Sequence, residues 1–217
     1  PDTLTQNFLG SVDFTYDNGF IIAGTFFNSE NNSWDGYLLK TDSQGNQEWL
    51  KPYGDIHSEE IGFAITTQDS GYIMTGGKYW TSTDCDGYII KTDMNGNVQW
   101  DTTYGLSSYF DNFKRVKQLA DGSYIVGGST MDTVHTPTRS RITLTKLDSS
   151  GYQIWKRQYT YYGDSYEFGG KSDDYLEDLC LTNDNGFIIC GYIINNYMPG
   201  KNDLLLIKTD SLGYTCI

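Results

Sequence analysis

The sequence contains little of what most metal sites and catalytic triads are built from. It has only two histidines, His57 and His135, and four cysteines among 217 residues. No two cysteines form a Cys-x-x-Cys pair, so we expect no zinc site, and the sequence indicates no other metal or cofactor. Both histidines lie in segments without a counterpart elsewhere in the chain, which gives no support to a Ser-His-Asp triad.

Basic residues and long apolar runs are also scarce. Lys and Arg number 15 against 28 Asp and Glu, which gives a net charge of −13. Nucleic acid phosphates attract Lys and Arg, so this balance argues against a nucleic acid partner. No apolar run is long enough for a membrane-spanning helix. The opening residues PDTLTQNF carry no basic and apolar leader, and we interpret them as a mature or excised N-terminus.

Tyrosine and glycine are abundant, and one segment that contains both recurs about every 50 residues. Its clearest copies are DGYLLKTDSQGNQEWLKPYG at Asp35–Gly54 and DGYIIKTDMNGNVQWDTTYG at Asp86–Gly105. More divergent copies occupy Ile142–Gly163 and Asp203–Ile217. No segment has a helical period, so the composition and the repeat together predict an all-β chain.

Each repeat is predicted to contain four strands. A first strand leads into an Asp-x-Gly turn such as Asp17–Gly19, and a second strand follows it. The third strand leads into an Asp-x-x-Gly turn such as Asp93–Gly96, and the fourth follows that turn. The fourth strands are predicted at Gln47–Tyr53, Val98–Tyr104 and Gln153–Tyr159, and the first of the first strands at Leu9–Tyr16.

Four-stranded antiparallel units at this period are typical of β-propeller blades. We therefore predict a single β-propeller domain with blades at approximately 1–55, 56–106, 107–165 and 166–217. The fourth repeat ends before a complete fourth strand. Two arrangements remain open: a closed or nearly closed four-bladed ring, which we favour, and a segment of a larger propeller.

Two residue types recur at fixed positions and are interpreted as structural. A lysine lies in each third strand, and we expect it to pair with an acid of a first strand or with the Asp of its own third-to-fourth turn, latching blades together. A tryptophan in the fourth strand is expected to pack between blades. The residues are Lys40, Lys91, Lys146 and Lys208, with Trp49, Trp100 and Trp155.

The layout of Gly-Gly, a later Tyr and a later Trp is similar to kelch repeats. The full string from Asp-x-Gly-[Tyr/Phe]-Ile to Lys-Thr-Asp-x-x-Gly-Asn-x-x-Trp and Tyr-Gly more closely resembles propeller-type repeats of secreted and surface proteins from Bacteroidetes-type bacteria, often exported by the type IX system. This resemblance covers essentially the whole chain and implies an extracellular or cell-surface location. It also makes Thr133, within Asp132-Thr133-Val134, a candidate for O-glycosylation.

Two further local patterns leave alternatives open. Cys180 and Cys190 flank the turn Asn183–Gly186, and if residues 183 and 187 pair, these cysteines face each other. They are either a cross-strand disulfide or two free thiols. Asp93-x-Asn95-x-Asn97 resembles the start of a calcium loop but lacks the later Glu, so a turn is favoured over calcium binding.

The loops that differ between repeats carry aromatic and acidic residues, and they share one face of a propeller. Such residues suit a sugar or a protein surface. We expect a non-enzymatic extracellular module that binds or scaffolds, with a glycan or surface protein as partner, within a larger polypeptide or assembly. The alternatives are a carbohydrate-processing enzyme that uses loop carboxylates and a structural spacer or filament subunit. The residues proposed to contact a ligand are Trp34, Tyr79, Trp80, Tyr109, Phe110, Tyr161, Tyr162 and Tyr166.

Overall fold

The computed structural model describes residues 7–106, 109–132, 139–159, 172–195 and 202–215. These residues contain fifteen β-strands and no helix, which confirms the all-β prediction. The strands are β1 (Asn7–Phe14), β2 (Phe20–Asn28), β3 (Ser33–Thr41), β4 (Gln47–Tyr53), β5 (Ser58–Thr66), β6 (Tyr72–Thr81), β7 (Asp84–Thr92), β8 (Val98–Tyr104), β9 (Tyr109–Gln118), β10 (Tyr124–Asp132), β11 (Ser140–Leu147), β12 (Gln153–Tyr159), β13 (Ser172–Leu181), β14 (Phe187–Asn195) and β15 (Asn202–Thr209).

The strands pair as four antiparallel units that follow the sequence repeat. Unit 1 is β1–β4, unit 2 is β5–β8, unit 3 is β9–β12, and unit 4 contains β13–β15. Units 2 and 3 form one continuous sheet through a single parallel pairing of Cys85 with Phe110. The tight turns between the first and second strands place Asn18, Ser70 and Asn185 at positive φ, as such turns require.

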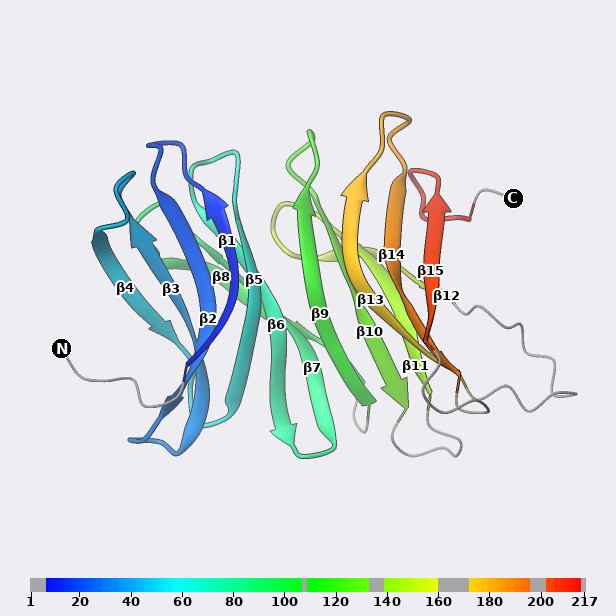
Figure 1. Ribbon diagram of the computed structural model, residues 1–217, viewed down its shortest axis with the longest axis horizontal. Helices are drawn as coiled ribbons and strands as arrows, with labels where there is room; N and C mark the ends of the chain where they lie inside the picture. The colour runs from blue at the N-terminus through cyan, green and yellow to red at the C-terminus, as the bar shows by residue number, and fades with distance from the viewer. Residues whose placement is uncertain (1–6, 107–108, 133–138, 160–171, 196–201, 216–217) are drawn as a thin grey trace, which may run out of the picture.

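The units stand in a row, with the first strands following one another in the order β1, β5, β9 and β13 across the view of Figure 1, where β6 and β7 are also visible between β5 and β9. Units 1 and 4 lie at opposite ends of this row. The described residues therefore do not form the closed or nearly closed four-bladed ring that was favoured from the sequence over a segment of a larger propeller. Closure is a contact between distant units, and the repeat pattern specifies only how neighbouring units pack.

Three apolar clusters hold the row together, one at each junction between neighbouring units. Leu38 of unit 1 packs with Ile61 of unit 2, Ile89 of unit 2 with Phe113 of unit 3, and Leu144 of unit 3 with Leu176 of unit 4. The recurring tryptophan stands over an aromatic ring of the next unit. The ring centroids of Trp49 and Tyr72, Trp100 and Tyr124, and Trp155 and Phe187 are 5.9, 6.2 and 6.3 Å apart.

A tyrosine four residues after each tryptophan adds a polar contact to the same junctions. Tyr53 donates a hydrogen bond to the Gly96 carbonyl at 2.8 Å. Tyr159 donates to the Gly213 carbonyl at 2.6 Å, and Tyr104 donates to the Gly151 carbonyl. Because the acceptor lies in the turn after the third strand of the next unit, each fourth strand holds its neighbour's outer edge.

The recurring lysine does not pair as predicted. Lys40 Nζ lies 2.9 Å from Asp17 Oδ2, and Lys91 Nζ lies 2.8 Å from Asp69 Oδ2, each Asp belonging to the first turn of the same unit. Lys146 and Lys208 approach Asp121 and Asp184 in the same way, at 3.8 and 2.8 Å. The lysines therefore connect strands within a unit and do not latch neighbouring units together.

Hydrogen bonds from Thr15 and Lys40 lower the pKa of Asp17 to about 2. Because this folded-state value is below the ordinary 3.8, Asp17 adds stability above about pH 4, and this contribution is lost as the pH falls toward 2. We expect the free energy of unfolding of Asp17→Asn to decrease less steeply than that of the wild type as the pH falls from 4 to 2. Urea titrations across this range test the prediction, and an unchanged slope would contradict it.

Of the two alternatives left open for Cys180 and Cys190, the structure shows the free thiols and not the disulfide. Cys180 pairs in register with Ile188, and Cys190 pairs with Asp178, so the two cysteines are not opposite each other. Both are free thiols. The prediction placed residue 183 opposite residue 187, whereas the hairpin closes with a hydrogen bond from Thr182 N to Gly186 O, which shifts the register.

Candidate functional site

A pocket of about 630 Å³ opens between β1, β5 and β9. It lies across units 1, 2 and 3, so its wall comes from segments far apart in the sequence. Its polar side chains include a carboxylate, an amide and two cations, which stand beside aromatic rings. The lining residues on which the site is built are Phe8, Trp34, Glu60, Asn112, Lys114 and Arg115.

Aromatic rings form the unit 1 side of the pocket. Trp34 on β3 lies 5.3 Å from the Phe8 ring and 5.4 Å from the Phe27 ring, measured between centroids. The backbone N–H of Trp34 donates to Ser58 Oγ at 3.2 Å, which ties β3 to the start of β5. This cluster presents apolar ring area next to polar groups, a combination suited to the two faces of a sugar ring.

Glu60 supplies the carboxylate of the pocket. It lies near the start of β5, where Tyr79 donates a hydrogen bond from its hydroxyl to Glu60 Oε2 at 2.9 Å. The Tyr79 ring packs edge-on against Phe110 of unit 3, with centroids 5.5 Å apart. Glu60 is therefore oriented by a phenol that is itself held in place, as a proton-transfer group requires.

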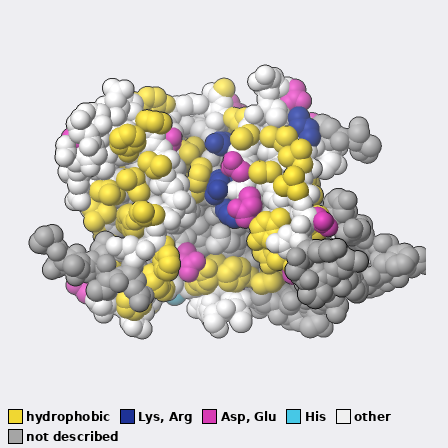
Figure 2. Space-filling view, in the orientation of Figure 1, with side chains coloured by type: hydrophobic (Ala, Val, Ile, Leu, Met, Phe, Trp, Pro, Cys, Tyr) yellow, Lys and Arg dark blue, Asp and Glu magenta, His cyan; other side chains and the backbone are white. Residues whose placement is uncertain are grey.

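The cations of the pocket are held by unit 4. Lys114 Nζ lies 2.6 Å from Glu177 Oε1, and Arg115 Nε lies 3.2 Å from Asp178 Oδ1. Figure 2 shows such charged side chains between two areas of hydrophobic side chains. Because each cation already has an anion, the two form a structured wall and add no net charge to the pocket.

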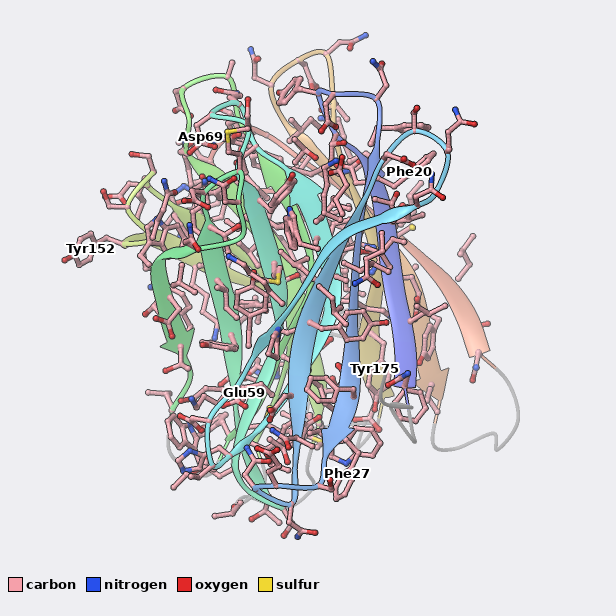
Figure 3. The ribbon with its side chains drawn as sticks, turned by 90° about the vertical axis from the view of Figure 1, so that its left-hand side faces the viewer. Phe20, Phe27, Glu59, Asp69, Tyr152 and Tyr175 are labelled. Carbon is pink, nitrogen blue, oxygen red and sulfur yellow. The ribbon has the colours of Figure 1, made fainter. Side chains whose placement is uncertain are left out.

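A second polar cluster lies between units 1 and 2. In Figure 3 it is found at the end of the strands near Glu59 and Phe27, whereas Phe20 and Asp69 mark the opposite end. Lys78 Nζ lies 2.7 Å from Asp55 Oδ2 and 2.9 Å from Glu59 Oε1. The Glu59 side chain is fully buried. The ammonium group of Lys78 pairs with both carboxylates, so we assign this cluster a role in the stability of the fold.

The rings and hydrogen bonds around Lys78 complete this cluster. Lys78 Nζ stands 5.4 Å from the ring centroids of both Trp80 and Tyr88. Asp55 Oδ1 is 2.8 Å from His57 Nδ1, and the His57 ring packs edge-on against Trp80. Lys78 was not among the predicted site residues, because a lysine at this position occurs in one unit only, directly after the paired glycines of β6.

The structure separates the predicted ligand-contact residues into several groups. Trp34 lines the pocket, Tyr79 and Phe110 stand behind Glu60, and Trp80 belongs to the Lys78 cluster. The Tyr109 backbone N–H donates to the Leu106 carbonyl at 2.9 Å at the start of β9. Tyr161, Tyr162, Tyr166 and the glycosylation candidate Thr133 lie outside the described residues.

The resemblance of Asp93–Asn97 to a calcium loop has another explanation. Asp93 Oδ1 accepts hydrogen bonds from the backbone N–H groups of Asn95 and Asn97, both at 2.8 Å, and Oδ2 accepts from Asn97 Nδ2 at 2.9 Å. The carboxylate thus serves its own turn. Elsewhere in the described residues, no cluster of His, Cys, Asp and Glu has the composition of a metal site.

No protein-family model and no curated protein matches the sequence. Solved structures do resemble it. An endo-arabinase from Bacteroides thetaiotaomicron is 12% identical with a TM-score of 0.53, over 92% of this chain and 72% of that one. The fold is a β-propeller. A hypothetical protein from Leishmania major is 11% identical with a TM-score of 0.51, over 92% of this chain and 65% of that one.

A xylan β-1,4-xylosidase from Bacillus halodurans is 12% identical with a TM-score of 0.50, over 97% of this chain and 42% of that one. At these identities the likeness shows the fold alone. It nevertheless corrects the expectation of a non-enzymatic binding or scaffolding module, because propellers of this shape include enzymes named for arabinan and xylan. In addition, no helix in the described part of the chain is long and apolar enough to span a membrane.

Proposed function

We propose that the four units are consecutive blades of the propeller of a carbohydrate-processing enzyme, with a saccharide bound in the pocket between β1, β5 and β9. The observation that carries this proposal is the composition of the pocket. Glu60, the Trp34 ring and the Asn112 amide all line a single space of about 630 Å³. A carboxylate, a stacking platform and an amide are the groups that orient a sugar ring beside a proton-transfer residue.

The fold supports the same substrate class. The endo-arabinase and the xylosidase that share the fold are named for polymers of pentose sugars. The pocket size supports it independently, since small-molecule sites are clefts of about 300–1,000 Å³. Arabinan and xylan are therefore the first substrates to test.

Glu60 is the residue to which we assign proton transfer at the glycosidic oxygen. Its Oε2 accepts from Tyr79, which leaves Oε1 for the substrate. Glycoside hydrolysis generally uses a second carboxyl group as nucleophile or base. Glu60 is the only carboxylate among the described residues that line the pocket. We therefore assign both proton transfers to it: its proton passes to the glycosidic oxygen as the bond to the anomeric carbon breaks, and water then adds to that carbon and returns a proton to Glu60.

The proposal is tested by release of reducing ends from arabinan and xylan, with binding of the same polymers followed by calorimetry. We expect Glu60→Gln to reduce hydrolysis about 100-fold or more while binding persists, because general acid–base groups contribute roughly 10²–10⁴-fold. Trp34→Ala should weaken binding through loss of ring stacking. Glu48→Gln, which changes a carboxylate 2.8 Å from Lys40 and outside the pocket, is the matched control.

The result that would contradict the proposal is equally specific. If the wild-type protein binds these polymers and releases no reducing ends, the assignment of Glu60 to proton transfer is wrong. Equal losses of hydrolysis in Glu60→Gln and Glu48→Gln would also overturn it, because only Glu60 lines the pocket.

A further inference from the structure

The two ends of the row of units expose apolar side chains, and all of these positions except that of Phe14 are buried in the other units. We call the side of unit 1 that faces away from unit 2 the entry face, and the side of unit 4 that faces away from unit 3 the exit face. The entry face contains Leu9, Val12, Phe14, Phe20 and Ile22, and the exit face contains Ile188, Cys190, Leu204 and Leu206.

The strand register shows that the exit face is one half of a junction. Leu38, Ile89 and Leu144 occupy the same position of the third strand in units 1, 2 and 3, each packs in the cluster shared with the next unit, and each is 0% exposed. Leu206 occupies this position in unit 4 and is 63% exposed. Its neighbour Leu204 is 85% exposed.

The entry face is the other half. Ala64, Val116 and Leu179 occupy one position of the first strand in units 2, 3 and 4, pack toward the preceding unit, and are at most 1% exposed. Val12 occupies this position in unit 1 and is 62% exposed. The space beside Gly45 is likewise not filled by a neighbouring unit. A Cβ added at Gly96, Gly151 or Gly213 would meet the tryptophan of the preceding unit, whereas one at Gly45 meets nothing within 4 Å.

We propose that the exit face of one copy of this chain docks on the entry face of a second copy, so that the row of units continues head to tail. Both halves of the junction are present on each molecule, and the same pair of faces is already joined three times within the chain. Large apolar patches of this kind on a water-soluble surface mark interaction sites. Each molecule would use two different faces, which produces a closed ring if the rotation closes and a filament if it does not.

Two features set the strength of this contact. The described part of unit 4 has no fourth strand to place a Trp and a Tyr against Phe20 and Gly45 of the second copy, so the contact is weaker than the internal junctions. The net charge of −13 on each chain also opposes association. Because salt screens this repulsion and leaves apolar burial intact, association should increase with ionic strength.

The test is sedimentation velocity of the full chain from about 1 to 100 μM, a range that covers weak protein–protein association. The wild type should form dimers or longer species, more so at high salt. Val12→Lys should disable only the entry face and Leu206→Lys only the exit face, so each variant alone should be monomeric. Both positions are already exposed, so the fold is retained. Val98→Lys, at an exposed position of β8, is the matched control and should associate as the wild type does.

An equimolar mixture of the two variants distinguishes the proposed arrangement. The intact exit face of Val12→Lys can dock on the intact entry face of Leu206→Lys, so the mixture should contain dimers and nothing larger. A monomeric wild type at all concentrations would overturn the proposal and indicate that another blade, or unit 4 of the same molecule, covers the entry face. Association that survives in Leu206→Lys alone would also overturn it, since it would show pairing of two entry faces.

Discussion

Phe187→Ala is expected to lower the free energy of unfolding by about 3–5 kcal/mol, the usual cost of removing a buried aromatic side chain. Phe187 opens β14 in unit 4, and its side chain is 1% exposed. It lies in the cluster shared with unit 3, under the Trp155 ring. Its removal leaves a cavity at the junction and takes away the partner of that tryptophan.

Phe20→Ala is the matched control, because Phe20 occupies the same position of unit 1. Its side chain lies on the entry face and contacts Phe14, with ring centroids 5.4 Å apart. Among the described residues no unit packs against this side of Phe20, so its removal creates no enclosed cavity there, and we expect a cost of about 1 kcal/mol. The same chemical change thus has different effects at the two positions, because only one junction is occupied.

Urea unfolding at low protein concentration measures both variants, with the entry face then uncovered. The Phe187→Ala midpoint should fall with little change in the slope that reports exposed surface. Equal losses in the two variants would contradict this account, since they would mean that Phe20 is as well packed as Phe187. That result would indicate that unit 1 meets another unit even in the dilute protein.

The sequence predicted the unit well, because each strand boundary has a local cause. The predicted fourth strands Gln47–Tyr53, Val98–Tyr104 and Gln153–Tyr159 coincide with β4, β8 and β12. The first strand was predicted two residues late, at Leu9–Tyr16. The turn begins at Thr15, whose hydroxyl hydrogen-bonds Asp17, so the strand ends at Phe14.

The predicted partner of the recurring lysine was wrong, because the sequence does not show which carboxylate oxygens are already hydrogen-bonded. Asp42 was a reasonable partner for Lys40, but Asp42 Oδ1 accepts from the backbone of Gln44 and Asn46, and Oδ2 accepts from the Asn46 side chain. Its oxygens are already used by its own turn. Asp17 has a remaining oxygen, and the lysine bonds to it at 2.9 Å.

The pocket was not predictable from the repeat. Its wall combines Trp34, Glu60 and Arg115 from units 1, 2 and 3, and these residues occupy positions that the repeat does not share. The carboxylates of a site were predicted in the variable loops. The pocket carboxylate instead lies on β5, because the first strands border the space between the units. The sequence repeat therefore predicts the four-stranded units. The position of the candidate pocket follows only from how these units pack together.

Lys78→Met is expected to lower the free energy of unfolding by about 3–5 kcal/mol at pH 7, since it leaves the buried Glu59 without its cation. In the wild type, burial would lower the pKa of Lys78, but the hydrogen bonds that its ammonium group donates to Asp55 and Glu59 raise this pKa above its usual value. Burial raises the pKa of Glu59 despite the nearby cation. Lys114→Met, which breaks an exposed pair with Glu177, should cost about 1 kcal/mol or less.

The pH dependence of the Lys78→Met loss identifies its cause. A carboxyl group with a raised folded-state pKa binds more protons when folded, so stability falls as the pH rises from the ordinary value of 4.5 through the folded value. Without Lys78 this pKa rises further, and the loss should shrink as the pH falls from 7 toward 5. Adding Glu59→Gln to Lys78→Met should recover part of the loss at pH 7 and remove its pH dependence. A loss that is equal at pH 5 and pH 8 would show that packing of the lysine stem between Trp80 and Tyr88, and not the buried charge, is what Lys78 contributes.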